Sequence, residues 1–169
     1  FGYPVFNADY EVSKLYTNDK KIFLKLKKRI PKYISSFPIK KSEITNAILA
    51  NKKNLKKIIN IVHKEIRKKL TIFLKKNINS KFVILDIPLL IENKIFKKKD
   101  ILIFIESKKK DIDKKIKKRP NFNIKIIKMF RNIQLSPKNK KKKSHFVIKN
   151  TFTKKTVKKE IKKILKEIS

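Results

Sequence analysis

Two aspartates stand just beyond short apolar runs, where a carboxylate can take part in phosphoryl transfer. Asp9 comes soon after the run at residues 4–6, and Asp86 directly follows the run at residues 82–85. If both runs are parallel strands, the two carboxylates lie at the edge where such sheets bind ligands. There, Asp9 could accept the proton of a substrate hydroxyl, and Asp86 could help to hold Mg²⁺ beside nucleotide phosphates. Both also have structural interpretations, since Asp9 could cap a helix over residues 10–17 and Asp86 could form a turn.

Two pairs of basic residues are spaced by four positions, which places each pair on one face of a helix. Lys115 and Arg119 could clamp a phosphate, because Arg suits two-pronged phosphate contacts. In a chain this basic, the same pair could equally be a solvated helix face. His63 and Arg67 form the second pair, in which His63 could hydrogen-bond a substrate group or serve only in packing.

Several catalytic motifs are absent from the 169 residues. Gly2 is the only glycine, so the sequence holds no glycine-rich phosphate-binding loop, no dinucleotide-binding fingerprint and no serine-hydrolase elbow. The chain has no cysteine and only two histidines, His63 and His145, which excludes disulfides and argues against a zinc site. No apolar run is long enough to span a bilayer and no signal peptide is visible, so we expect a cytoplasmic protein.

The formal net charge of +36 raises the question of a nucleic-acid partner. Only four of the 49 basic residues are Arg, however, and the chain is also rich in Ile, Asn and Phe. Lys and these three residues share AT-rich codons, so a genome of low GC content would give the same excess on any fold. The lysines are also spread over the helices instead of clustering. We therefore expect no nucleic-acid partner, and keep a basic nucleic-acid-binding protein as the alternative.

Four apolar runs predict strands, and the stretches between them have helical periodicity. The second and third runs are continuous, as in buried parallel strands. Strands that alternate with helices indicate an α/β fold with a parallel sheet flanked by helices. The helical stretch after the first strand is too long for a simple crossover, and we interpret it as an inserted subdomain. The predicted strands cover residues 4–6, 82–85, 101–105 and 146–148, and the predicted helices residues 10–17, 41–49, 52–78, 108–118, 123–134 and 153–168.

In this order, the segments resemble the dephospho-CoA kinase family along nearly the whole chain. The most specific match begins at Asp86, where D-I-P-L-L-I-E resembles the family's D-[IV]-P-L-L-[FI]-E. The opening F-G-Y-P-V-F-N-A-D resembles G-x-P-V-x-D-A-D, and H-K-E-I-R from His63 resembles H-P-x-[VI]-R. Further matches are K-S-E-I from Lys41 through Ile48-Leu49, then Arg119-Pro120, Gln134, the basic run to Lys143, and residues 146–150, whose pattern is closest to alphaproteobacterial members.

The resemblance implies a P-loop fold like that of nucleoside-monophosphate kinases, built as a single kinase domain over residues 1–169. Members of the dephospho-CoA kinase family transfer the γ-phosphate of ATP to the ribose 3′-hydroxyl of dephospho-CoA. They use Mg²⁺ as cofactor, and the reaction is the last step of coenzyme A biosynthesis. Asp9 would be the general base, and Asp86 would lie near the metal and the phosphates.

The remaining site residues are also assigned by resemblance. A helical insertion of approximately residues 11–78 would cover the CoA substrate, and approximately residues 108–143 would form a lid over ATP. The substrate-binding residues would be His63, Arg67, Pro88, Leu89 and Glu92, and the nucleotide-binding residues would be Lys115, Arg119 and, near the adenine, Asn150.

The sequence departs from the family pattern at six positions, which affects the lid contacts more than the fold. Asn7 replaces the first Asp of D-A-D, although Asp9 is kept, and His145 replaces an Asp before the last strand. The other departures are Lys41 for Arg, Lys64 for Pro, Ile112 for Gln and Lys115 for Arg.

The start of the family pattern is not among the 169 residues. Gly2 is typical of a helix C-cap, so we expect a helix before residue 1 and interpret the chain as a fragment or a miscalled start. The absent segment would carry a central strand and the phosphate-binding loop, and its loss would leave two strands with unpaired edges. We therefore expect the chain as written to be unstable and inactive, and an inactive remnant of the kinase is a further alternative.

The lysines at residues 140–143 predict a solvated or phosphate-facing loop.

Overall fold

The computed structural model describes residues 1–119 and 122–169, and these form two compact units, Phe1–Pro88 and Leu89–Ser169. The sequence match at Arg119-Pro120 therefore falls partly outside the described residues. Among the described residues, no helix is long and apolar enough to cross a bilayer.

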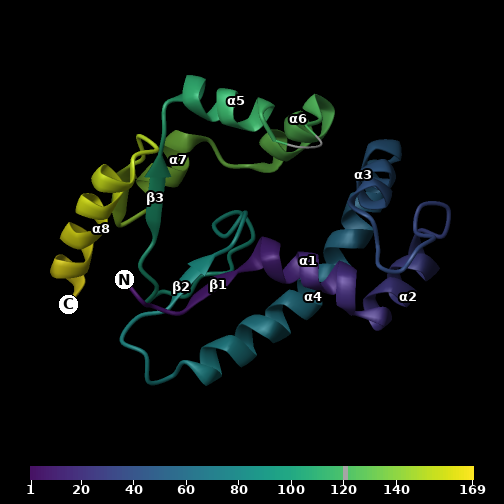
Figure 1. Ribbon diagram of the computed structural model, residues 1–169, viewed down its shortest axis with the longest axis horizontal. Helices are drawn as coiled ribbons and strands as arrows, with labels where there is room; N and C mark the ends of the chain where they lie inside the picture. The colour runs from purple at the N-terminus through teal and green to yellow at the C-terminus, as the bar shows by residue number, and fades with distance from the viewer. Residues whose placement is uncertain (120–121) are drawn as a thin grey trace. The chain divides into compact units, whose positions relative to one another are not determined.

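The strands of the first unit pair in parallel, as predicted. Strand β1 (Val5–Asn7) lies beside β2 (Ile84–Asp86), with Asn7 opposite Asp86 at the last position of each strand (Figure 1). Because both strands end at the same edge, the residues that follow them are brought close together.

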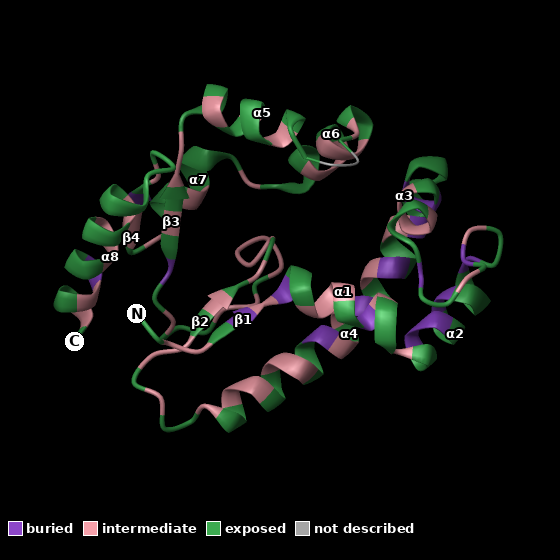
Figure 2. Cartoon of the chain, in the orientation of Figure 1, coloured by how far each residue is buried: buried purple, intermediate pink, exposed green. Residues whose placement is uncertain are grey.

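Four helices connect these two strands and hold most of the buried core (Figure 2). Leu15, Ile22, Leu26 and Ile34 are each at most 2% exposed, and they come from the first two helices and the loop that follows. The helices are α1 (Ala8–Asn18), α2 (Lys20–Arg29), α3 (Lys41–Ala50) and α4 (Lys52–Lys76).

Polar side chains begin three of these helices. Asn7, Asp19 and Asn51 stand immediately before α1, α2 and α4, and the side chain of each accepts a hydrogen bond from a backbone N–H in the first turn. The predicted cap at Asp9 was therefore wrong, because Asn7 takes that position and Asp9 is the second residue of the helix.

Glu43 ties the loop before α3 to the helix. Its carboxylate accepts hydrogen bonds from the backbone and hydroxyl groups of Ser35 and Ser36 and from the backbone N–H of Lys40. Burial would raise the pKa of Glu43, but these hydrogen bonds outweigh it and lower the pKa to about 2. The family-like segment from Lys41 thus has a structural function in this chain.

The second unit also contains one pair of parallel strands. Strand β3 (Ile103–Glu106) pairs with β4 (Phe146–Lys149) along its whole length. Leu102, Ile148 and Ile164 are its buried apolar residues among those described. The helices are α5 (Lys109–Lys117), α6 (Ile124–Ile133), α7 (Pro137–Lys142) and α8 (Lys154–Ile168).

Three details of the predicted elements were wrong. Helix α5 ends at Lys117, so Lys115 and Arg119 do not share a helix face, and a proline at position 120 disfavours helical geometry at the residue before it. Lys140, Lys141 and Lys142 lie in α7 and not in a loop, because Ser136 caps this helix and Pro137 begins it. Helix α2 was not predicted.

Candidate active site

The edge at the ends of β1 and β2 holds three polar side chains. The Asn7 Nδ2 atom donates a 2.8 Å hydrogen bond to Asp86 Oδ2, and Asn7 Oδ1 accepts the backbone N–H of Tyr10. Asp9 lies in the first turn of α1, directly after β1, and is exposed, as is Asp86. The two predicted catalytic carboxylates thus lie at the ends of neighbouring strands, Asp86 as the last residue of β2 and Asp9 just after β1, and Asn7 is hydrogen-bonded to Asp86.

His63 and Arg67 lie one turn apart on the long helix α4, as predicted. His63 is half-buried and Arg67 is exposed. Burial lowers the pKa of His63, and the positive charge of Arg67 lowers it further. His63 is therefore neutral at pH 7, when its imidazole can both donate and accept hydrogen bonds.

The segment after β2 folds back in consecutive turns. Pro88 is exposed, and Leu89 adopts the left-handed conformation with φ 56° while its carbonyl accepts the N–H of Asn93. The Glu92 carboxylate accepts the N–H of Leu135 at 2.8 Å and lies 3.0 Å from Lys140 Nζ. Burial would raise the pKa of Glu92, but its hydrogen bonds and the charge of Lys140 lower it.

The carboxyl ends of β3 and β4 hold the predicted adenine-side residue. The Asn150 backbone N–H donates to the carbonyl of Glu106 at 2.7 Å, and Asn150 Oδ1 accepts the N–H of Phe152 at 2.8 Å. Phe152 has a φ of 61°, and the ammonium of Lys115 lies 4.8 Å from the centre of its ring. Lys115 and Asn150 therefore belong to one cluster, while Arg119 is exposed beyond the end of α5.

His145 fills the place of a family Asp without losing a hydrogen-bond acceptor. The side-chain Nδ1 atom of His145 accepts the backbone N–H of Leu102 at 2.9 Å, and the backbone N–H of His145 donates to the Leu102 carbonyl at 2.8 Å. These two hydrogen bonds hold the residue before β3 beside the residue before β4.

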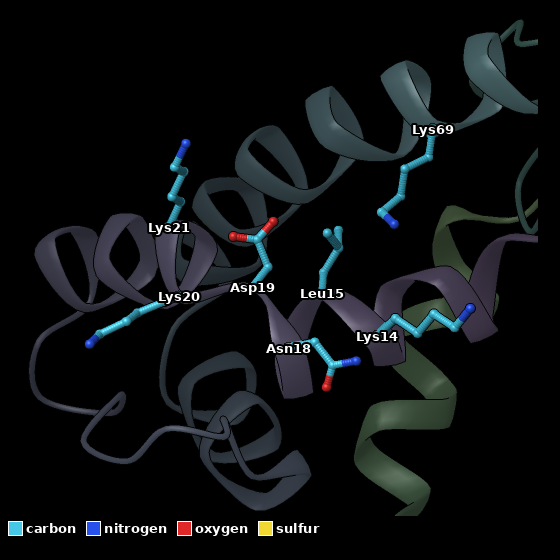
Figure 3. Close-up of a pocket in the computed structure, with 7 residues that line it drawn as sticks. All are labelled: Lys14, Leu15, Asn18, Asp19, Lys20, Lys21 and Lys69. Carbon is cyan, nitrogen blue, oxygen red and sulfur yellow. The ribbon is translucent and has the colours of Figure 1, made fainter.

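An open hollow of about 520 Å³ lies in the first unit beside the junction of α1 and α2 (Figure 3). Its lining is basic, but the ammonium groups of Lys20 and Lys21 point in different directions. None of the predicted site residues lines it, so we do not assign it to the active site. The lining residues are Lys14, Leu15, Asn18, Asp19, Lys20, Lys21 and Lys69.

Sequence reasoning treated Asn7 as a departure and overlooked Lys140 and Phe152 as residues near the site. The signal for Asn7 was present, because Asn is a preferred N-cap and stands directly after an apolar run. The contacts of Lys140 and Phe152 join residues far apart in sequence, so spacing alone carries no sign of them.

Known proteins match the chain over its length. The family model described as dephospho-CoA kinase matches residues 1–155. A dephospho-CoA kinase from the Wolbachia of Brugia malayi is 32% identical over all of this chain and 87% of that protein. One from Rickettsia conorii is 32% identical over 99% of this chain and 85% of that protein.

Two solved structures show a similar fold. The crystal structure of TT1252 from Thermus thermophilus has a TM-score of 0.78 and 20% identity, covering 99% of this chain and 86% of that one. The dephospho-CoA kinase from Campylobacter jejuni has a TM-score of 0.63 and 24% identity with the same coverage. Together with the aspartates at the strand ends and the D-I-P-L-L-I-E segment, the matches to the family model and to the Wolbachia and Rickettsia proteins place this chain in the dephospho-CoA kinase family.

Proposed function

We propose that Asp9 is the general base in the phosphorylation of the ribose 3′-hydroxyl of dephospho-CoA by ATP. The observation that carries this proposal is the position of Asp9, exposed in the first turn of a helix that begins where β1 ends. A carboxylate there can accept the hydroxyl proton as the oxygen attacks the γ-phosphorus and the bond to ADP breaks.

Mg²⁺ is part of the same proposal, with Asp86 as the protein group nearest to it. The described residues contain no cluster of three or more possible metal ligands. Mg²⁺ in nucleotide enzymes commonly takes only one or two carboxylates and completes its shell with phosphate oxygens and water. The exposed Asp86 carboxylate, of which one oxygen is held by Asn7, fits that donor set. When bound, the ion would neutralise charge on the phosphates.

Dephospho-CoA would lie against the helical insertion of approximately residues 11–78. Arg67 is exposed and suits two-pronged contacts with the substrate's diphosphate, and the neutral His63 can hydrogen-bond a polar group of the substrate. Pro88 and Leu89 would contact the substrate from the turn after β2. Glu92 would support this turn indirectly, because Leu135 and Lys140 already occupy its carboxylate.

ATP would lie against the second unit. Lys115 and Asn150 both contact Phe152, Lys115 through the ring and Asn150 through the backbone N–H. Arg119 lies beyond the last residue of α5 and is exposed. The lid of approximately residues 108–143 contains two of these residues.

The test uses a form of the chain that is extended before Phe1 by a strand, phosphate-binding loop and helix of the family. We expect this extended form to phosphorylate dephospho-CoA with ATP. Asp9→Asn in that form should lower kcat by about 10²–10⁴-fold, the usual contribution of a general base, with little change in KM for dephospho-CoA.

Asp19→Asn is the matched control, because Asn still caps α2 through its side-chain oxygen. It should leave kcat unchanged. Full kcat in the Asp9→Asn variant would refute the proposed role of Asp9.

A further inference from the structure

Asn7 uses both polar atoms of its side chain in two different directions. Its Nδ2 atom donates to Asp86 Oδ2 on the neighbouring strand, and its Oδ1 atom accepts the N–H of Tyr10 at the start of α1, each at 2.8 Å. The orientation of the amide is unambiguous, since exchanging the two atoms would set an oxygen against a carboxylate and an NH₂ against an N–H.

The two bonds join the parts of the chain that carry the proposed catalytic groups. Asp86 ends β2 opposite Asn7, and Asp9 lies in the first turn of the helix that Asn7 caps. We infer that Asn7 is a positioning residue that fixes Asp86 Oδ2 and the start of α1 at once, and so sets where Asp86 and Asp9 lie relative to each other. This inference rests on the proposed function for its meaning in catalysis, but not for its geometry.

No other side chain of similar size can make both contacts at pH 7. An ionised Asp at position 7 can still cap α1 but has no proton to donate to Asp86, and it would place a second negative charge against that carboxylate. A Leu of similar size would lose both bonds. The amide therefore also keeps a third carboxylate out of an edge that already holds Asp9 and Asp86, where anionic phosphates would bind.

Strand β2 and helix α1 hold three carboxylates near Asn7. Asp86 lies on β2, Asp9 and Glu11 on α1, and Glu11 is paired with Lys69 of α4 at 2.9 Å. Among the described residues, the carboxylate hydrogen-bonded to Asn7 is that of Asp86. A charge introduced at position 7 would therefore act first on Asp86.

The test uses the extended form of the chain and measures its stability, so it does not require activity. Asn7→Asp should increase the unfolding equilibrium constant at pH 7 by roughly tenfold, because a charge-assisted hydrogen bond is replaced by repulsion across the strand pair. Asn51→Asp is the matched control, because Asn51 also caps a helix, α4, and an Asp there keeps the cap and suits the helix dipole.

A second measurement follows the side-chain amide of Asn7 by ¹⁵N NMR. Its resonance should move in Asp86→Ala, which removes the acceptor of the Nδ2 hydrogen bond, and should stay close to its original position in Asp86→Asn, which keeps an oxygen acceptor. Equal stabilities of the Asn7→Asp and Asn51→Asp variants at pH 7, or an Asn7 amide resonance that is the same in Asp86→Ala as in the unchanged chain, would overturn the inference. A lack of kinase activity in the extended chain would instead count only against the proposed function.

Discussion

Glu92 and Lys140 form an ion pair of 3.0 Å that joins the turn after the D-I-P-L-L segment to helix α7. The side chains are only 11% and 23% exposed, respectively. The same Glu92 oxygen also accepts the backbone N–H of Leu135, two residues before α7 begins. The carboxylate therefore connects the turn to two positions near the end of the proposed lid.

Glu92→Ala should destabilise the second unit by about 1–3 kcal/mol, because it leaves the N–H of Leu135 and the ammonium of Lys140 without their acceptor. Glu92→Gln should cost less, since its amide oxygen can still accept the N–H of Leu135. The effect should be seen as faster hydrogen exchange at the Leu135 amide. Lys138→Gln is the control, because Lys138 is an exposed lysine of the same helix. Equal exchange at Leu135 in all three variants would contradict the assigned contact.

Glu43 should make the first unit sensitive to acid. Its pKa of about 2 lies below the ordinary value, so the stability that its hydrogen bonds provide is complete above about pH 4.5 and is lost as the pH falls toward 2. Urea unfolding at a series of pH values should show this loss in the unchanged chain and a flatter profile in Glu43→Ala. Glu167→Ala alters an exposed glutamate and should leave the profile as it is. A Glu43→Ala profile that matches the unchanged chain would count against this account.

The pattern of buried residues explains why the strands and the long helix were predictable while some contacts were not. Continuous apolar runs and the spacing in α4 located β1, β2 and that helix to within a few residues. Apolar spacing does not reveal the whole α4 core, however, because the buried residue in its first turn is Asn54, whose amide donates to the Ala47 carbonyl at 2.9 Å. A polar residue can replace an apolar one there only because a specific acceptor meets it, and spacing does not reveal acceptors.

Helix ends carried signals that spacing arguments overlooked. Asp19 precedes the apolar residues of α2, and Ser136-Pro137 is a strong helix start, but both lie in stretches where lysines dominate. For the site, sequence placed Asp9 and Asp86 at strand ends correctly. The link between them through Asn7 could not be predicted, because it depends on the register that sets Asn7 opposite Asp86.

His63 should respond to the charge of Arg67. The pKa of His63 is lowered by burial and then by Arg67, so protonation below about pH 6.5 occurs more readily in the unfolded chain and stability falls as the pH drops. Arg67→Gln removes the charge and should move the ¹H NMR titration of His63 to higher pH. Lys64→Gln, an exposed change beside His63 for which no shift of His63 is expected, is the control. No difference between the two variants would show that burial alone sets the pKa of His63.

The contact between Lys115 and Phe152 should contribute to the binding of ATP. The Lys115 ammonium lies 4.8 Å from the ring centre, and the Phe152 N–H is held by Asn150, so the ring keeps the ammonium beside the end of β4. In the extended form of the chain, Phe152→Ala should raise KM for ATP roughly three- to tenfold, the effect of losing a cation–π contact of about 0.5–1 kcal/mol and some stacking surface. KM for dephospho-CoA should stay unchanged, because the residues proposed to bind dephospho-CoA lie on α4 and in the turn after β2. Lys110→Gln, an exposed change on the same helix as Lys115, should alter neither constant. If Phe152→Ala changed both KM values equally, the residue would act on the fold of the second unit and not on nucleotide binding.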